Sequence, residues 1–216
     1  MRIRGGCGTP NPHDFLRKEI YRDCTGSEAP EPMLATYRDQ PLLNFTNAVV
    51  NGPYQPPFLR KWFERAFLRS PNETELDAYA NSGKPLLETL TDMVEEMSYR
   101  ENLTGDAYIE ALFTRLINYS TQSINFEFWR NLLTRYGTRE AARRMVRSEA
   151  MSRILVDEAH RMLYRIKASQ ADIDYWFSVW TVSASYPRPY EDLVNGITNW
   201  EWYAHLRRRE AFLNCQ

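Results

Sequence analysis

Cysteine is scarce in this chain, and long apolar runs are missing. Its three cysteines, Cys7, Cys24 and Cys215, are too few and too scattered for a disulfide framework or a zinc site. We therefore expect them to be free or buried thiols. No apolar run approaches the ~18 residues that a membrane-spanning helix needs, so the sequence predicts no transmembrane segment.

The first residues also lack the apolar stretch of a secretory signal peptide, so no export signal is visible. Cys7 follows two glycines, as a lipid-modified cysteine can, but Arg4 and the missing apolar stretch depart from that signal. Membrane association is therefore expected only if Cys7 is lipid-modified.

An excess of charge of either sign is missing too. The chain has 27 basic and 28 acidic residues, and its formal net charge is −1. Such a balance gives no overall attraction to nucleic acid or anionic lipid. With 43% hydrophobic and 13% aromatic residues, however, the 216-residue chain can bury a substantial core. We expect a folded protein that recognises charged partners locally and does not bind nucleic acid.

Motifs of catalysis and cofactor binding are absent from the sequence. It has no Gly-rich phosphate loop, no His-Glu-x-x-His helix and no Gly-x-Ser-x-Gly elbow. Its histidines, His13, His160 and His205, are far apart, and His160 falls on an apolar helical stripe, where a hydrogen-bonded core or boundary histidine is the simpler interpretation. We expect a protein that is not an enzyme and has no cofactor and no metal site.

Strand signals are nearly absent, whereas helical signals recur. Apolar residues over 58–67 follow the spacing of an amphipathic helix, and the same stripe returns over 108–117 and, more weakly, over 155–164 and 15–24. After each stripe, an aliphatic residue or Phe is followed three positions later by an aromatic residue. These pairs are Leu34 and Tyr37, Leu76 and Tyr79, Phe126 and Trp129, and Ile173 and Trp176.

Turn signals lie between each apolar stripe and the aliphatic–aromatic pair that follows it. The segment SPNE over 70–73 predicts Ser70 as a helix N-cap, a proline in the first turn and Glu73 as the partner in a capping box. The segment SQAD over 169–172 predicts a similar arrangement with Asp172. A further apolar helical segment closes each unit, so each unit should contain a long helix, a shorter helix and a third helix.

The chain therefore divides into four units. They span 14–57, 58–105, 106–153 and 154–206, between an N-terminal extension, 1–13, and a C-terminal tail, 207–216. We predict an all-α fold in which these tandem three-helix units stack into one elongated or compact helical domain.

The segment YIEALFTRLINYSTQSINFEFWRNLLTRYGTREAARRMVRSEAM over 108–151 resembles the repeat called domain of unknown function 4214, a helical unit of bacterial surface and secreted proteins. The resemblance rests on Leu112 and Phe113, Ser120 to Ser123, Phe128 and Trp129, Gly137, and Ser148 and Glu149. The unit over 154–206 is similar through DIDYW and YEDLVNGITNWEWY. The pattern also looks similar to phycobilisome linker domains, whose role is to organise other proteins.

Two groups of residues are candidates for binding a partner. Arg139, Arg143 and Arg147 recur every four residues and form one basic helix face, which suits a nucleic-acid surface or, in keeping with the neutral net charge, a solvated face or an acidic protein partner. Tryptophans crowd the last unit, where they either fill the core or mark an interface. The candidate partner-binding residues are Arg139, Arg143, Arg147, Trp180, Trp200, Trp202, Arg207, Arg208 and Arg209.

Taken together, these features predict a non-enzymatic structural or linker subunit that binds other protein subunits of a larger assembly. The alternative is a cell-surface or envelope-associated module for adhesion or carbohydrate binding. The family resemblance implies this alternative, and it favours an exported or cell-envelope location.

Overall fold

Helices make up the regular structure of this protein. The computed structural model describes residues 12–50, 56–183, 189–198 and 203, and in these residues it contains eleven α-helices and no strand. The predicted all-α fold class is confirmed. Across the described part of the chain, none of the helices is long and apolar enough to cross a bilayer.

The first half of the chain forms two groups of three helices. The first group is α1 (Pro12–Thr25), α2 (Glu31–Tyr37) and α3 (Leu42–Val50), and the second is α4 (Pro56–Phe67), α5 (Glu73–Ala80) and α6 (Leu86–Arg100).

The second half also forms two groups. In the third, α7 (Gly105–Ala111) continues into a π-helical turn, η1 (Leu112–Leu116), and a short 3-10 turn, η2 (Thr121–Ser123), precedes α8 (Phe126–Val146). Gly137, at φ 78° and ψ 179°, divides α8 into two helical segments. The fourth group is α9 (Glu149–Tyr164), α10 (Gln170–Ser183) and α11 (Pro189–Thr198).

The predicted apolar stripes lie on buried helix faces. In α4, the side chains of Phe58, Leu59, Trp62, Phe63 and Ala66 are all at most 7% exposed. Burial of this face supplies the main driving force for docking α4 against its neighbours. That the four groups are repeats of one structural unit stays a prediction.

One of the two predicted capping boxes is present. Ser169 accepts a hydrogen bond from the N–H of Asp172 at 3.2 Å, and the Asp172 carboxylate accepts one from the N–H of Ser169 at 3.0 Å. The prediction for α5 was wrong by two residues, because its N-cap is Asn72, which forms a capping box with Glu75. An Asn side chain reaches the N–H three residues ahead as a Ser hydroxyl does, so both positions had suitable chemistry.

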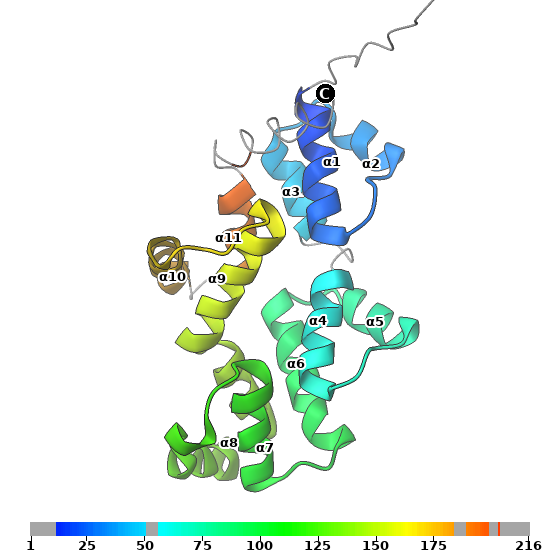
Figure 1. Ribbon diagram of the computed structural model, residues 1–216. Coiled ribbons are helices and arrows are strands. Elements are labelled where there is room, and N and C mark those ends of the chain that lie inside the picture. Colours follow the sequence, from blue (N-terminus) through cyan, green and yellow to red (C-terminus); the bar gives the residue numbers. More distant parts are fainter. Residues whose placement is uncertain (1–11, 51–55, 184–188, 199–202, 204–216) are drawn as a thin grey trace, which may run out of the picture.

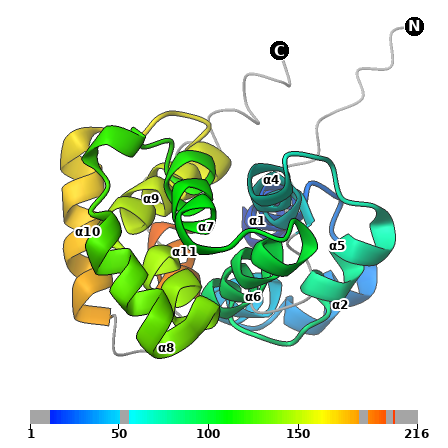
Figure 2. The same cartoon turned by 90° about the horizontal axis from the view of Figure 1, so that it is seen from below.

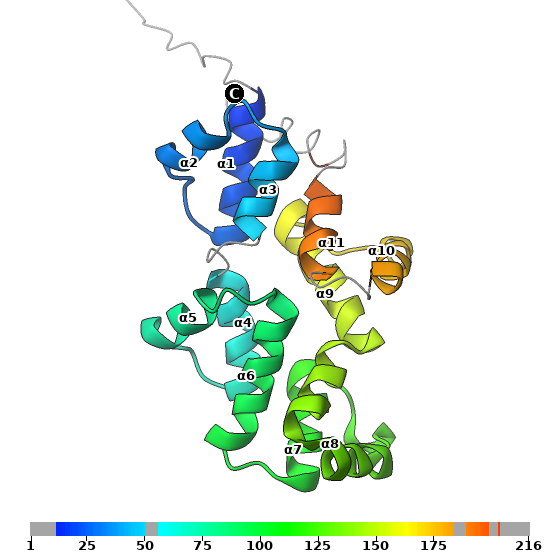
Figure 3. The same ribbon diagram turned by 180° about the vertical axis from the view of Figure 1, so that it is seen from behind.

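The four helix groups are arranged two by two. In Figure 1 the chain passes down one side through α1–α3 and α4–α6 and returns up the other through α7–α8 and α9–α11, and Figure 3 shows the same arrangement from behind. As a result, α11 packs against α3, and α9 packs against α1. Tyr203 donates a hydrogen bond to Asp23 at 2.9 Å, which also joins the last described residue to α1.

The groups on the two sides meet in a common core. Figure 2 shows α7–α11 on one side and α1–α6 on the other. The rings of Phe58 and Tyr190 lie 5.0 Å apart there, and Tyr190 is 1% exposed. Cys24 is a buried free thiol, as the sequence predicts, and burial raises its pKa. Cys7 and Cys215 lie outside the described residues.

Candidate functional site

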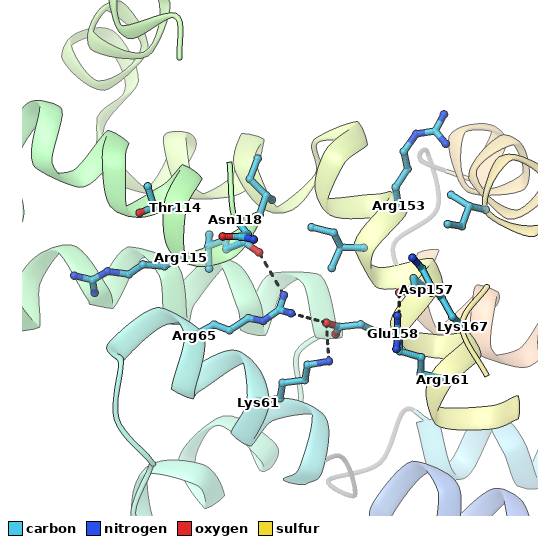
Figure 4. Close-up of a pocket in the computed structure, with 14 residues that line it drawn as sticks. Lys61, Arg65, Thr114, Arg115, Asn118, Arg153, Asp157, Glu158, Arg161 and Lys167 are labelled. Carbon is cyan, nitrogen blue, oxygen red and sulfur yellow. Dashed lines mark hydrogen bonds and ion pairs between the residues drawn. The ribbon is translucent and has the colours of Figure 1, made fainter. Parts of the chain in front are cut away.

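An open cleft of about 790 Å³ lies between α4, the end of η1, α9 and the start of α10 (Figure 4). We call it the basic cleft, because six basic side chains line it and only two acidic ones do. The basic residues are Lys61, Arg65, Arg115, Arg153, Arg161 and Lys167, and the acidic ones are Asp157 and Glu158.

Glu158 lies at the centre of the basic cleft. Its Oε1 is 2.8 Å from Lys61 Nζ and 3.3 Å from Arg65 Nη2, and its side chain is only 7% exposed. Lys61 and Arg65 are four residues apart on α4 and therefore share one helix face. Two cations from α4 thus share a single carboxylate from α9, as Figure 4 shows.

Arg65 is held by two further contacts. Its Nη1 donates a hydrogen bond to the carbonyl oxygen of Leu116 at 3.4 Å, and its guanidinium lies 4.7 Å from the centre of the Trp62 ring. Stacking of a guanidinium on an indole is favourable and limits the positions that the side chain can adopt. Arg65 is therefore positioned by the fold.

The second acidic residue fixes the other side of the cleft. Asp157 pairs with Arg161 at 2.8 Å and also accepts a hydrogen bond from the N–H of Ala168 at 2.9 Å. This second contact holds the segment after α9, which includes Lys167. In the described part of the chain, Lys167 has no ion-pair partner, so its charge is uncompensated.

The two remaining arginines are engaged elsewhere. Arg115 pairs with Glu101 at 2.8 Å, and Arg153 pairs with Glu149 at 2.8 Å and with Asp174 at 2.6 Å. Figure 4 shows both guanidinium groups directed away from Glu158. The inner cleft therefore has four cations, Lys61, Arg65, Arg161 and Lys167, against the carboxylates of Asp157 and Glu158, which leaves two positive charges uncompensated.

The rest of the lining is aliphatic or neutral. Leu116, Ile117, Ile154 and Ile173 contribute apolar surface, and Thr114 and Asn118 contribute small polar groups. No aromatic side chain is among the lining residues. The cleft thus combines positive charge with aliphatic surface.

The turn that borders the cleft has an unusual backbone. The π-helical residues of η1 end at Leu116, and Asn118 follows with a φ of 50°. Single π-helical turns within helices are often found at functional sites. Here the turn directs the Leu116 carbonyl oxygen toward Arg65.

The candidate arginines of the sequence lie on another surface. Arg139 of α8 is 2.8 Å from Asp92 and 2.7 Å from Glu95 of α6. Arg147, the residue directly after α8, is 3.0 Å from Glu88 of the same helix. These residues line no part of the basic cleft.

The other candidate residues either lie away from the cleft or fall outside the described side chains. Arg143 pairs with Glu140 of its own helix at 2.8 Å. Trp180 belongs to α10, but its side chain is outside the described part of the structure. Also outside the described residues are Trp200, Trp202, Arg207, Arg208 and Arg209. That these residues bind a partner stays a prediction.

His160 lies in the core and does not line the cleft. It is 3% exposed, as its place on an apolar stripe predicts, and its ring meets Tyr164 edge-on at 5.0 Å. The expected hydrogen bond is missing at Nε2, which has no partner among the described residues. Burial lowers the pKa of His160, and the nearby carboxylates of Asp172 and Asp157 oppose that shift. The residues that the structure describes include no cluster of His, Cys, Asp or Glu suited to a metal ion.

Comparison with known proteins identifies no relative. No family model matches the chain, and no curated protein or solved structure matches it significantly. The resemblance to domain of unknown function 4214 and to phycobilisome linkers therefore stays a prediction that rests on residue patterns.

The sequence alone did not reveal the basic cleft. Lys61 and Arg65 are four residues apart, and Asp157 to Arg161 form a second charged group. Each side of the cleft is therefore visible in the sequence as a local group of charged residues. Nothing in the sequence shows that these two groups meet, because almost two predicted units separate them. Only the return of α9 beside α4 brings them together.

Proposed function

We propose that this protein is a non-enzymatic subunit that binds other proteins within a larger assembly, and that the basic cleft is its docking site. The observation behind this proposal is the excess of lysine and arginine over carboxylates in an open, partly aliphatic cleft. A cleft with uncompensated charge and apolar surface can gain both electrostatic attraction and apolar burial when a partner binds.

The chemistry of the lining supports binding over catalysis. The cleft contains no histidine and no cysteine, and both of its carboxylates are paired with basic side chains. A hydroxyl or thiol nucleophile needs a general base beside it, and the hydroxyl of the lining, Thr114, instead donates to the Glu110 carbonyl oxygen.

Site-specific photo-cross-linking in the native cells tests the proposal. A photoreactive amino acid replaces Thr114, an exposed residue that lines the cleft and whose hydroxyl donates to the Glu110 carbonyl at 2.7 Å. Thr36 is the matched control, because it is also exposed and donates to the Pro32 carbonyl at 2.9 Å, but lies on α2. Mass spectrometry then identifies the cross-linked proteins.

We expect one partner to cross-link from position 114 and not from position 36, and we expect Lys61→Gln to reduce this cross-link. Recovery of the chain only as a monomer, with no cross-link from position 114, would rule the proposal out. Equal cross-linking from both positions would show that contact does not involve the cleft.

One observation favours the second candidate function, carbohydrate binding. Tyr119 is 46% exposed and Phe128 48% exposed, and both rings lie beside the cluster of Phe113 and Trp129. Exposed aromatic faces can stack on sugar rings. A glycan-array signal that disappears with Phe128→Ala and persists with Lys61→Gln would favour this function over docking through the cleft.

A further inference from the structure

We infer that the basic cleft binds an acidic segment of a partner protein, one with both carboxylate and aliphatic side chains, and that Glu158 competes with this segment for Lys61 and Arg65. The inference rests on the proposed function, because it names the chemistry of the partner at the same site. It follows from charge, from donor capacity and from the character of the lining.

The α4 cations retain unused capacity for an anion. A lysine ammonium has three donors and a guanidinium has five, and Glu158 contacts one nitrogen of each side chain. The side chain of Lys61 is 46% exposed and that of Arg65 is 35% exposed, so an incoming group can reach both. The pairing with Glu158 shows in addition that a carboxylate fits between these two cations.

The other lining groups favour a carboxylate over a phosphate. Phosphates are commonly held by backbone N–H groups at helix N-termini. This cleft borders the end of η1, where the Leu116 carbonyl oxygen accepts from Arg65. It also borders the start of α10, but the backbone N–H groups of Ala168 and Ser169 there are already bonded to the carboxylates of Asp157 and Asp172. Carbonyl oxygens and two resident carboxylates disfavour a compact dianion more than a single carboxylate.

The same lining disfavours nucleic acid and sugar as ligands. Single-stranded nucleic acids typically stack their bases on aromatic side chains, and the cleft has none. Its apolar groups are Leu116, Ile117, Ile154 and Ile173, which suit the aliphatic side chains of a peptide. Alternation of acidic and aliphatic residues is therefore the chemistry that matches this cleft.

Glu158 should then weaken the binding of the acidic segment. Its carboxylate stabilises the α4 cations within the protein, and an acidic segment must share or displace that contact. Glu158→Gln keeps the shape of the side chain and removes its charge, so it should tighten binding. The variants Lys61→Gln and Lys167→Gln should do the opposite.

Fluorescence anisotropy measures these effects. The probe is a fluorescein-labelled peptide, Glu-Leu-Glu-Glu-Leu-Glu, titrated with the full chain at low ionic strength, and the control peptide has Gln in place of each Glu. Arg60→Gln and Glu127→Gln are matched charge controls, because both residues are exposed and lie outside the cleft.

We expect the acidic peptide to bind and the Gln peptide not to bind. Lys61→Gln and Lys167→Gln should each weaken binding about two- to fivefold, and Glu158→Gln should tighten it by a similar factor. Both control variants should stay within about twofold of the unchanged protein, and added salt should weaken binding.

Several results would overturn the inference. Equal binding of the Gln peptide would exclude recognition of carboxylates, and stronger binding of inorganic phosphate or single-stranded DNA would assign the cleft to another anion. A folded Glu158→Gln variant with unchanged affinity would exclude competition. If that variant fails to fold, Lys167→Gln still tests whether the cleft recognises carboxylates, because Lys167 has no ion-pair partner in the described structure, and an unchanged affinity would exclude such recognition.

The two proposals can fail separately. A cross-linked partner together with no binding of the acidic peptide would retain the docking function and refute the acidic segment. Binding of the peptide without any cross-linked partner in cells would retain the preference of the cleft for acidic segments and refute the docking function.

Discussion

Glu191 of α11 accepts a hydrogen bond from the backbone N–H of Leu86, the first residue of α6, at 2.8 Å. The residue before α6 is Pro85, and its side chain provides no cap. A carboxylate from the fourth helix group thus satisfies one of the open N–H groups at this helix start and lies at the positive end of its dipole.

Removal of this carboxylate should destabilise the fold. Glu191→Ala leaves a buried N–H unsatisfied, so we expect the free energy of unfolding to fall by about 1–3 kcal/mol. Glu191→Gln should lose less stability, since its amide oxygen can still accept a hydrogen bond from the N–H of Leu86. Asp192→Ala is the control, because Asp192 is exposed in the same turn and should cost only about 0.5 kcal/mol. Urea denaturation followed by circular dichroism measures these differences, and equal losses at both positions would contradict the capping role.

The first helix of each group is followed by a left-handed residue. The φ angles are 72° at Gly26, 52° at Leu68, 50° at Asn118 and 56° at Arg165. Residues other than glycine and asparagine adopt this conformation at a cost. Leu68 and Arg165 therefore strain the ends of α4 and α9.

Glycine should relieve that strain at Leu68. Leu68 is 69% exposed, so its side chain contributes little to the core. We expect Leu68→Gly to be more stable than Leu68→Ala by about 1 kcal/mol, because both remove the side chain and only glycine adopts a positive φ freely. Thermal or urea unfolding of the two variants provides the comparison. An alanine variant as stable as the glycine variant would show that no strain is stored there.

His160 should make stability depend on pH. Burial lowers its pKa in the folded state below the ordinary value of 6.5, so the folded protein keeps the ring neutral at a pH where the unfolded chain takes up a proton. The free energy of unfolding should therefore fall as the pH drops below 6.5 toward the lower folded-state pKa. His160→Leu should lose less stability than the unchanged protein over about pH 7 to 5. Parallel slopes in urea denaturation at several pH values would refute this role.

Gly196 allows α11 to approach α10 closely. A Cβ atom at this position would lie 2.8 Å from Cζ3 of the Trp176 ring, which is closer than atoms pack. We expect Gly196→Ala to lower the free energy of unfolding by about 1–3 kcal/mol, despite the better helix propensity of alanine.

Replacing the Trp176 indole by a smaller ring tests whether this clash explains the loss of stability. In a Trp176→Phe background, Gly196→Ala should cost less, because the clashing atoms are gone. A double-mutant cycle measured by urea denaturation gives the coupling energy, and a value near zero would assign the cost of Gly196→Ala to something other than the indole ring.

Much of the helical structure could be predicted because its causes are local. The stripe over 58–67 depends on side chains that recur along one helix face, and α4 buries those residues. The capping box at Ser169 and Asp172 likewise involves residues three positions apart. The wrong cap at Ser70 shows where such prediction stops, since Asn72 offered equivalent chemistry two residues later and its partner Glu75 is also held by Arg69 and Arg100.

Helical periodicity and the all-α class could thus be predicted from the order of the residues alone, because the apolar spacing, caps and turns that indicate a helix lie within a few turns of one another. The basic cleft was decided by tertiary structure: Lys61 and Glu158 lie 2.8 Å apart only because the second half of the chain folds back along the first. The cap that Glu191 provides for α6 has the same origin. Contacts of this kind depend on how whole helix groups pack, and no short stretch of sequence specifies that packing.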